Sequence, residues 1–303
     1  MDKRILITGA TGLIGKELVQ LLLLHGYKVS ILSRHAISTT GVDVYLWDIA
    51  NNQIDLKAFD NVDVLVHLAG ESIAAKRWTK RQKKEIINSR VNSANLLFET
   101  VKKHQIPLKK FICSSAVGIY GDRGTEVLTE NSRLGNGFLP LCCKLWENAA
   151  DQFNTLGIDV VKIRTGFVLS DQGGALGPIT KMIRWYLGAP LGSGKQLVPW
   201  IHLNDLTAIY LKAISNNKMK GTYNACAANP VTNKTLTVEI AKILKKPILP
   251  LHVPSFMLRL LMGKMSILPL MSTLTSNRKL EQTGFSFKFD TLQSALKDIF
   301  HKN

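Results

Sequence analysis

The sequence has no uncharged apolar run long enough to cross a lipid bilayer. Its best candidate, residues 256–274, is interrupted by Arg259, Lys264 and Pro269. The N-terminal residues lead directly into the strand-like segment RILITGA, and we therefore expect no signal peptide. These absences exclude an integral membrane protein, and we expect a cytoplasmic one.

Cysteine is also scarce, and its arrangement excludes two classes of site. The chain has 4 cysteines, with no CxxC pair and no spacing typical of metal ligands. A cytoplasmic protein keeps such thiols reduced. We therefore predict neither a disulfide framework nor a metal site.

Acidic residues are few, with 22 Asp and Glu against 39 Lys and Arg, for a net charge of +17. Residues 206–303 hold 14 cations against 4 acids, and residues 76–90 hold seven cations against Glu85 alone. The simplest interpretation is a solvated basic surface, although phosphorylated ligands or an anionic membrane would also suit it. We do not predict nucleic-acid binding, because no helix-turn-helix, RNA-recognition or zinc-finger pattern accompanies the charge.

What the first half does contain is alternating strand and helix patterns. Apolar segments such as RILITG, KVSILSR and VDVLVHLAG alternate with amphipathic ones, and such apolar strands are typical of a parallel sheet covered on both faces. We predict an α/β fold, a doubly wound parallel (Rossmann) sheet with a smaller C-terminal α/β lobe. Glycine and proline become frequent after residue 166. We therefore assign 1–165 to the nucleotide domain and 166–303 to a substrate lobe partly interleaved with it.

A glycine-rich turn, ITGATGLIG, joins the first predicted strand to its helix. Gly9, Gly12 and Gly15 allow a tight turn and a close approach of the backbone to a pyrophosphate, which the helix N-terminus attracts. The motif is specific because of its place between a strand and a helix. The predicted cofactor contacts in this turn are Gly9, Thr11, Gly12, Leu13, Ile14 and Gly15.

The end of the second strand indicates which dinucleotide binds. An acidic residue there would favour NAD, but the sequence has Ser33 and Arg34, and a guanidinium suits a 2′-phosphate. We therefore expect NADP rather than NAD. Asp48 is a candidate for the adenine amino group or, equally, a helix N-cap. After the next apolar strand, Leu68, Ala69 and Gly70 should lie along the cofactor.

Taken together, these segments resemble the extended short-chain dehydrogenase/reductase superfamily of NAD(P)-dependent epimerases and dehydratases. More narrowly, they resemble an atypical epimerase-like subgroup with a C-terminal domain of unknown function. The resemblance spans nearly the whole chain. It depends on the motifs GATGLIG, HLAGESIAAKRWT, INSRV, SSAVGIYGDRG, KLWENAA, RTGFVLSDQGGALG, PWIHLNDL and GTYNACAANPVTN.

The resemblance implies a catalytic set of serine, tyrosine and lysine. Ser115 matches the serine, with Ser114 beside it on the cofactor, and Lys144 matches a lysine that also binds the cofactor. The position of the tyrosine, four residues before the lysine, is Pro140, which transfers no proton. The resemblance also implies that Arg164 lies along the nicotinamide.

Three residues are candidates to replace the missing tyrosine. Tyr120 is close in sequence to the serines, but we favour a structural role for it. Glu71 follows Gly70 and would serve as a catalytic acid or base if burial raised its pKa, or would simply pair with a nearby cation. His67 lies within an apolar strand and is expected to be a core histidine.

The predicted substrate contacts are Glu71, Arg90, Trp200 and His202. Glu71 and Arg90 belong to the subgroup's signature, and we expect them to form a buried pair or a substrate clamp. Trp200 and His202 are expected to flank the cleft, and Asp205 to anchor a helix. The segment GGALG, residues 173–177, fits a lid or a surface loop.

Two functions remain open at this point. The first is an NADP-dependent oxidoreductase or sugar-nucleotide-epimerase-like enzyme, which acts by hydride transfer on a small substrate without the usual tyrosine. The second is a non-catalytic NADP-binding sensor or regulatory protein. Residues 256–274 also suggest peripheral membrane association, although we expect this segment to pack against the sheet. A homodimer is compatible with the sequence.

Overall fold

A computed structural model describes residues 3–37 and 39–301. At its centre is an eight-stranded sheet with the strand order β12-β8-β6-β5-β1-β2-β3-β4. All neighbouring strands in it are parallel except β3 and β4. In chain order the strands are β1 (Arg4–Thr8), β2 (Lys28–Ser33), β3 (Val42–Asp48), β4 (Gln53–Ile54), β5 (Val62–His67), β6 (Lys110–Ala116), β8 (Asp159–Thr165) and β12 (Gly221–Ala225). The predicted doubly wound α/β class is confirmed.

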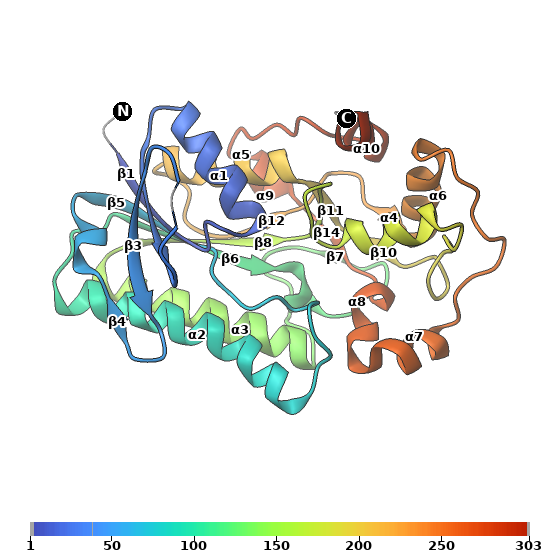
Figure 1. The fold of residues 1–303 in the computed structure, drawn as a ribbon, viewed down its shortest axis with the longest axis horizontal. Coiled ribbons are helices and arrows are strands. Elements are labelled where there is room, and N and C mark those ends of the chain that lie inside the picture. The colour runs from blue at the N-terminus through green and yellow to red at the C-terminus, as the bar shows by residue number, and fades with distance from the viewer. Residues whose placement is uncertain (1–2, 38, 302–303) are drawn as a thin grey trace.

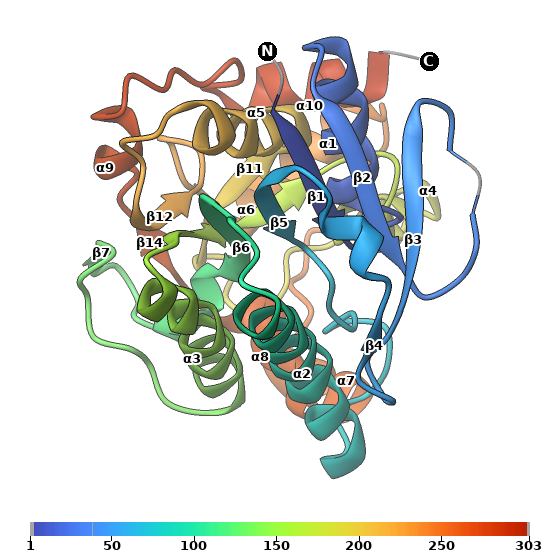
Figure 2. The same ribbon diagram turned by 90° about the vertical axis from the view of Figure 1, so that its left-hand side faces the viewer.

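Two pairs of helices cover the sheet (Figures 1 and 2). On one face, α1 (Leu13–Leu24) packs beside α5 (Leu203–Ser215), and on the other α2 (Lys80–Lys103) packs beside α3 (Phe138–Asp151). The central strands β1, β2, β5, β6 and β8 are largely buried between these layers, which explains their apolar sequences. The described residues also form four short 3₁₀ helices, Leu56–Phe59, Val117–Tyr120, Gln152–Leu156 and Gly263–Ser266.

Local signals fix the ends of the long helices. Thr79 caps α2, because its side chain accepts a hydrogen bond from the backbone N–H of Gln82. The helix ends at Lys103 with two lysines in its last turn, where cations favour the helix dipole. On the opposite face, His202 caps α5 through the backbone N–H of Asn204.

The second half of the chain contributes both a strand and a helix to the main sheet. β12 pairs with β8 at the sheet edge, and α5 packs against α1. Buried side chains of α5 join the same core as β1, β2 and α1. The sheet is therefore completed only by residues beyond 166.

A separate core holds the C-terminal lobe together. Leu176, Trp200, Leu236 and Leu296 pack in it with their neighbours. Its helices are α4 (Leu176–Arg184), α6 (Asn233–Ile243) and α10 (Leu292–His301), whereas α9 (Arg278–Glu281) packs on β12 and buries Leu280 in the core of the main sheet. Its short strands are β9 (Phe167–Leu169), β10 (Leu197–Val198), β11 (Trp200–His202), β13 (Val231–Thr232) and β14 (Leu274–Thr275), the last paired with β7 (Val127–Leu128).

The apolar segment near residue 260 does not pack against the sheet as expected. It forms α7 (Ser255–Met262) and α8 (Ile267–Leu270), which lie beside the N-terminal end of α2 (Figures 1 and 2). In α7 only Leu258 is fully buried. Among the described residues, none of the helices combines the length and the apolar character that a membrane span needs.

Candidate functional site

The glycine turn between β1 and α1 lies at the carboxyl edge of the sheet. Gly9 has φ +73°, a left-handed conformation that favours glycine, and a Cβ there would lie 2.7 Å from the backbone of Leu68 and Ala69. A Cβ on Gly15 would lie 2.3 Å from the carbonyl oxygen of Gly9. Both glycines are therefore required by the packing of the protein itself.

Gly12 is different, because the protein leaves space around it. Its φ of −78° suits any residue, and a Cβ at this position would meet the Gly9 oxygen at 3.3 Å and no other described atom within contact distance. Gly12 is exposed and is the N-cap of α1, whose first turn carries no acidic residue. An anion can thus approach the free N–H groups at this helix end.

The segment after β5 closes the other side of the turn. The backbone N–H groups of Leu68 and Ala69 donate to the carbonyl and hydroxyl oxygens of Thr8, at 3.1 and 3.3 Å. His67 is completely buried between Thr8 and Ser93, 2.7 and 3.1 Å from their hydroxyls. Burial lowers its pKa to about 4, so this histidine is neutral and structural, as predicted.

The residues predicted to select the dinucleotide lie at the ends of β2 and β3. Arg34 is exposed just beyond β2, with no ion pair or hydrogen bond of its side chain among the described residues. Asp48 instead closes the turn that follows β3. Its carboxylate accepts hydrogen bonds from the N–H groups of Ala50 and Asn51 and from the Asn51 side chain, and these bonds lower its pKa. The predicted helix N-cap is wrong, because a turn to β4 and not a helix follows Asp48, and its contact with an adenine amino group stays a prediction.

Arg90 reaches the same edge of the sheet from α2. Its Nη1 donates to the carbonyl oxygens of Glu71 and Ile86 at 2.8 and 2.9 Å, and the guanidinium lies 4.9 Å from the Trp146 ring centroid. A Cβ on Gly70 would lie only 3.1 Å from its Cζ. Burial lowers the pKa of Arg90.

The predicted alternatives were a buried pair or a substrate clamp, and the structure shows a contact between Arg90 and Glu71 without an ion pair of their side chains. Arg90 binds the Glu71 backbone instead. In the described part of the chain, its Nε and Nη2 have no hydrogen-bond acceptor. The site thus holds a desolvated cation with unused donors beside a half-buried carboxylate.

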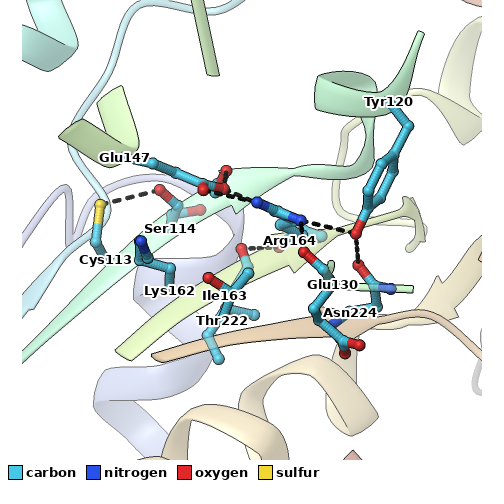
Figure 3. Close-up of polar contacts among 12 residues, drawn as sticks. Cys113, Ser114, Tyr120, Glu130, Glu147, Lys162, Ile163, Arg164, Thr222 and Asn224 are labelled. Atoms are coloured by element: carbon cyan, nitrogen blue, oxygen red, sulfur yellow. Dashed lines mark hydrogen bonds and ion pairs between the residues drawn. The ribbon is translucent and has the colours of Figure 1, made fainter. Parts of the chain in front are cut away.

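Ser115 takes part in a buried polar network, part of which is shown in Figure 3. Its hydroxyl donates to Oε1 of Glu147 on α3 at 2.7 Å. Arg164 on β8 binds the same carboxylate through Nε and Nη2, at 2.8 and 2.9 Å. Burial alone would lower the pKa of Arg164, but the hydrogen bonds and charge of Glu147 outweigh it and raise that pKa. The role predicted for Arg164 along a cofactor is therefore corrected to that of a buried partner of Glu147.

The network continues to Tyr120 and the second half of the chain. Nη1 of Arg164 donates to the Tyr120 hydroxyl at 2.8 Å, and that hydroxyl donates to Asn224 on β12 at 2.7 Å (Figure 3). Tyr120 is fully buried, and burial raises its pKa. The preferred structural role of Tyr120 agrees with these contacts.

Sequence reasoning missed Glu147, although the sequence contains a signal for it. Leu139, Cys143 and Glu147 follow one another at intervals of four, so they share one face of α3. A carboxylate on a buried helical face needs a cationic or hydrogen-bonding partner. Arg164, placed within the apolar strand segment DVVKIRT, is the matching cation.

The same face of α3 decides the position of Lys144. Leu139, Cys143 and Glu147 are buried toward the sheet, whereas Lys144 is exposed with Leu141 and Asn148 on the other side of the helix. Lys144 lines an outer groove with Lys83 and Lys84. The structure therefore separates Lys144 from Ser115, which corrects the expected pair. The inward residue nearest the lysine position is Cys143, and burial raises its pKa to about 12.

Trp200 and His202 do not flank a cleft, and this expectation is corrected. Trp200 is 1% exposed, and its indole N–H donates to the carbonyl of Asn229. His202 is 3% exposed, and its ring lies tilted by 36° against that of Phe289, with the two ring centroids 3.9 Å apart. Asp205 accepts the backbone N–H groups of Lys288 and Phe289, in agreement with its predicted anchoring role.

Ser114 and the segment 173–177 belong to two further predicted elements. Ser114 is at the end of β6, on the opposite face of the strand from Ser115. In the segment 173–177, a Cβ on Gly174 would lie 3.2 Å from the side chain of Leu13. The glycine-rich segment therefore lies against the residue that begins α1.

Comparisons with known proteins show to which family the chain belongs. Residues 5–140 match the NAD dependent epimerase/dehydratase family, and residues 253–299 match a domain of unknown function, DUF1731. An epimerase family protein of Staphylococcus aureus (strain MRSA252) is 34% identical over 304 residues, covering 99% of this chain and 100% of the relative. The chain belongs to the NAD-dependent epimerase/dehydratase family. The predicted family and its C-terminal domain are thereby confirmed.

Solved structures extend the comparison of this epimerase-family protein. The human epimerase family protein SDR39U1, crystallised with NADPH, is 31% identical with a TM-score of 0.87, covering 99% of this chain and all of that one. A nucleoside-diphosphate sugar epimerase from Corynebacterium glutamicum is 32% identical with a TM-score of 0.80, covering 100% of this chain and 59% of that one. UDP-glucuronic acid 4-epimerase from Bacillus cereus, 20% identical with a TM-score of 0.82, covers 98% of each and shares the fold.

Proposed function

We propose that this protein binds NADP and acts as an oxidoreductase or epimerase-like enzyme on a small anionic substrate. The carrying observation is the open N-terminus of α1 at Gly12, with the Arg34 guanidinium, unpaired among the described residues, beyond the neighbouring strand β2. In the human relative the crystallised cofactor is NADPH, which supports the same choice here.

The residues of the turn fit a nicotinamide dinucleotide. Gly12 and the first N–H groups of α1 would hold the pyrophosphate, and Arg34 the 2′-phosphate. Leu68, Ala69 and Gly70 would line the chain of the cofactor. When bound, the cofactor supplies or accepts a hydride, and the protein contributes orientation and charge.

Arg90 and Glu71 are the groups that we propose for the substrate. Nε and Nη2 of Arg90 are available to an anionic or carbonyl oxygen, and its partly desolvated position strengthens such a bond. The Glu71 carboxylate is half-buried and unpaired among the described residues, so it can exchange a proton with a bound substrate. The hydroxyl of Ser115 is oriented by its hydrogen bond to the Glu147 carboxylate.

Replacing Arg34 by alanine is expected to weaken NADPH binding by about 10- to 100-fold. A hydrogen bond to a charged group contributes about 1.5–3 kcal/mol to binding. NADH has no 2′-phosphate for Arg34 to bind, so its affinity should not change. Calorimetric titration with both cofactors measures the difference. His35→Ala, at the exposed neighbouring position, is the matched control and should change neither affinity. Equal losses for NADH and NADPH in Arg34→Ala would contradict the proposed selection.

A second function, a non-catalytic NADP sensor, is favoured by the exposed Lys144 and by the apolar Leu139 and buried Cys143 on the inward face of α3. Turnover distinguishes the two. We expect substrate-dependent NADPH oxidation with a panel of anionic carbonyl compounds, and a loss of at least about 10-fold in kcat/KM for Arg90→Lys, because lysine lacks the planar fork. Tight NADPH binding without turnover of any member of the panel would favour the sensor.

A further inference from the structure

One side of α7 carries a row of large apolar side chains turned toward solvent. Phe256, Met257, Leu260 and Leu261 are 68%, 42%, 78% and 61% exposed. Their spacing places them on one continuous face of the helix, and Leu258 is buried on the opposite face. Contiguous apolar surface of this kind on a protein marks a site of interaction. We call these four residues the α7 face.

The α7 face is held against the body of the protein by its surroundings. Met262 at the end of α7, Met265 in the following 3₁₀ helix and Leu268 in α8 pack with Trp78 and Ile86 of the α2 region. The Arg77 side chain also donates to the carbonyl oxygen of Leu261. The apolar face is therefore presented by a packed element, at the end of the molecule where α2 begins (Figure 2).

The two segments that form this face and its rim carry charge of only one sign, and Asp122 is an acid from another element that lines the adjoining groove. No Asp or Glu occurs in residues 240–280, which include α7 and α8, or in residues 72–84, which lead into and begin α2. Arg259 and Lys264 are exposed beside the α7 face and make no ion pair within the described ranges. Lys83 faces Lys264 across the groove between α2 and α8, where burial and the Lys264 charge lower the Lys83 pKa.

We propose that the α7 face, with its cationic rim, is a peripheral docking site for a bilayer surface that carries anionic lipid headgroups. The helix of 8 residues is too short to span a membrane and would lie in its plane. Phe256, Leu260 and Leu261 would enter the boundary between headgroups and acyl chains. Arg259, Lys264 and Arg77 would remain at the level of the lipid phosphates.

The charge pattern argues against a second copy of this chain as the occupant. A symmetric contact through the α7 face would bring the Arg259 and Lys264 cations of both copies together without acids between them. A bilayer with anionic lipid offers acyl chains to the apolar α7 face and negatively charged headgroups to the cationic rim. The proposal is independent of the dinucleotide site.

Sedimentation with lipid vesicles tests the proposal on the full-length protein. We expect binding to phosphatidylcholine vesicles with about 30% phosphatidylserine, and at least tenfold weaker binding to phosphatidylcholine alone. The variant Phe256→Ser/Leu260→Ser should lose at least tenfold in partitioning to the anionic vesicles. Arg259→Glu/Lys264→Glu should lose a similar factor, and high salt should weaken the wild type in the same way.

Matched controls separate this effect from general changes. Leu24→Ser removes an equally exposed leucine from α1, and Lys103→Glu/Lys218→Glu makes the same change of net charge far from α7. Both should bind vesicles as the wild type does, and all variants should keep NADPH affinity, which reports folding. Absent vesicle binding, equal binding to neutral vesicles, or a dimer in light scattering that Phe256→Ser/Leu260→Ser abolishes would each overturn the proposal.

Discussion

Replacing Gly12 by aspartate is expected to abolish dinucleotide binding while the protein stays folded. The backbone of Gly12 suits any residue, and aspartate is a favourable N-cap for α1. A carboxylate there would face the pyrophosphate, and two like charges about 4 Å apart repel by about 4 kcal/mol at a protein surface. The dissociation constant for NADPH should therefore rise roughly a thousandfold, as measured by calorimetry.

Two other substitutions make this prediction specific. Gly12→Ser also caps the helix but adds no charge, so it should retain much more affinity than the aspartate. Gly15→Ala should instead lower the stability of the protein, because its Cβ would lie 2.3 Å from the Gly9 oxygen. Unchanged NADPH affinity in Gly12→Asp would remove the basis for placing the pyrophosphate at α1.

The second large effect is expected at the buried pair of Glu147 and Arg164. Glu147→Ala leaves the Arg164 guanidinium, 5% exposed, without its counter-charge. Breaking such a pair costs about 3–5 kcal/mol of the free energy of unfolding. In urea denaturation the midpoint should fall by about 1 M.

The design includes a surface control and a double variant. Glu239→Ala breaks the i,i+3 pair with the exposed Lys242 on α6 and should cost less than about 1 kcal/mol. Glu147→Leu/Arg164→Met removes both buried charges, so it should be more stable than Glu147→Ala. If Glu147→Ala were no less stable than Glu239→Ala, the network would not support the sheet edge as described.

The parts of the fold that depend on local pattern were predictable from the sequence. Apolar strands, the glycine turn and the N-cap of α2 at Thr79 each follow from a few neighbouring residues. The glycine spacing also indicated the dinucleotide site, because strand, turn and helix occur together within residues 4–24. Arg34 was placed correctly at the end of β2 for the same reason.

The parts that depend on distant packing were not predictable. Which side of α3 faces the sheet is set by the pairing of Glu147 with Arg164, and this moves Lys144 to the surface. Trp200 was predicted to flank the cleft, but the loop near Asn229 buries it. This contact joins residues that are far apart in the sequence, so the local pattern does not reveal it. The apolar composition of α7 suggested a core helix, but the helix is turned so that mainly Leu258 is buried.

The position of β12 in the sheet has a consequence for synthesis on the ribosome. Until residue 215 has emerged, the nascent chain has an α1 without α5, and until residue 225 has emerged it has a β8 edge without its neighbour. An open edge and an uncovered apolar face favour aggregation. A fragment that stops near residue 165 should therefore be recovered mainly in inclusion bodies, whereas a chain that extends beyond β12 should be recovered in the soluble fraction.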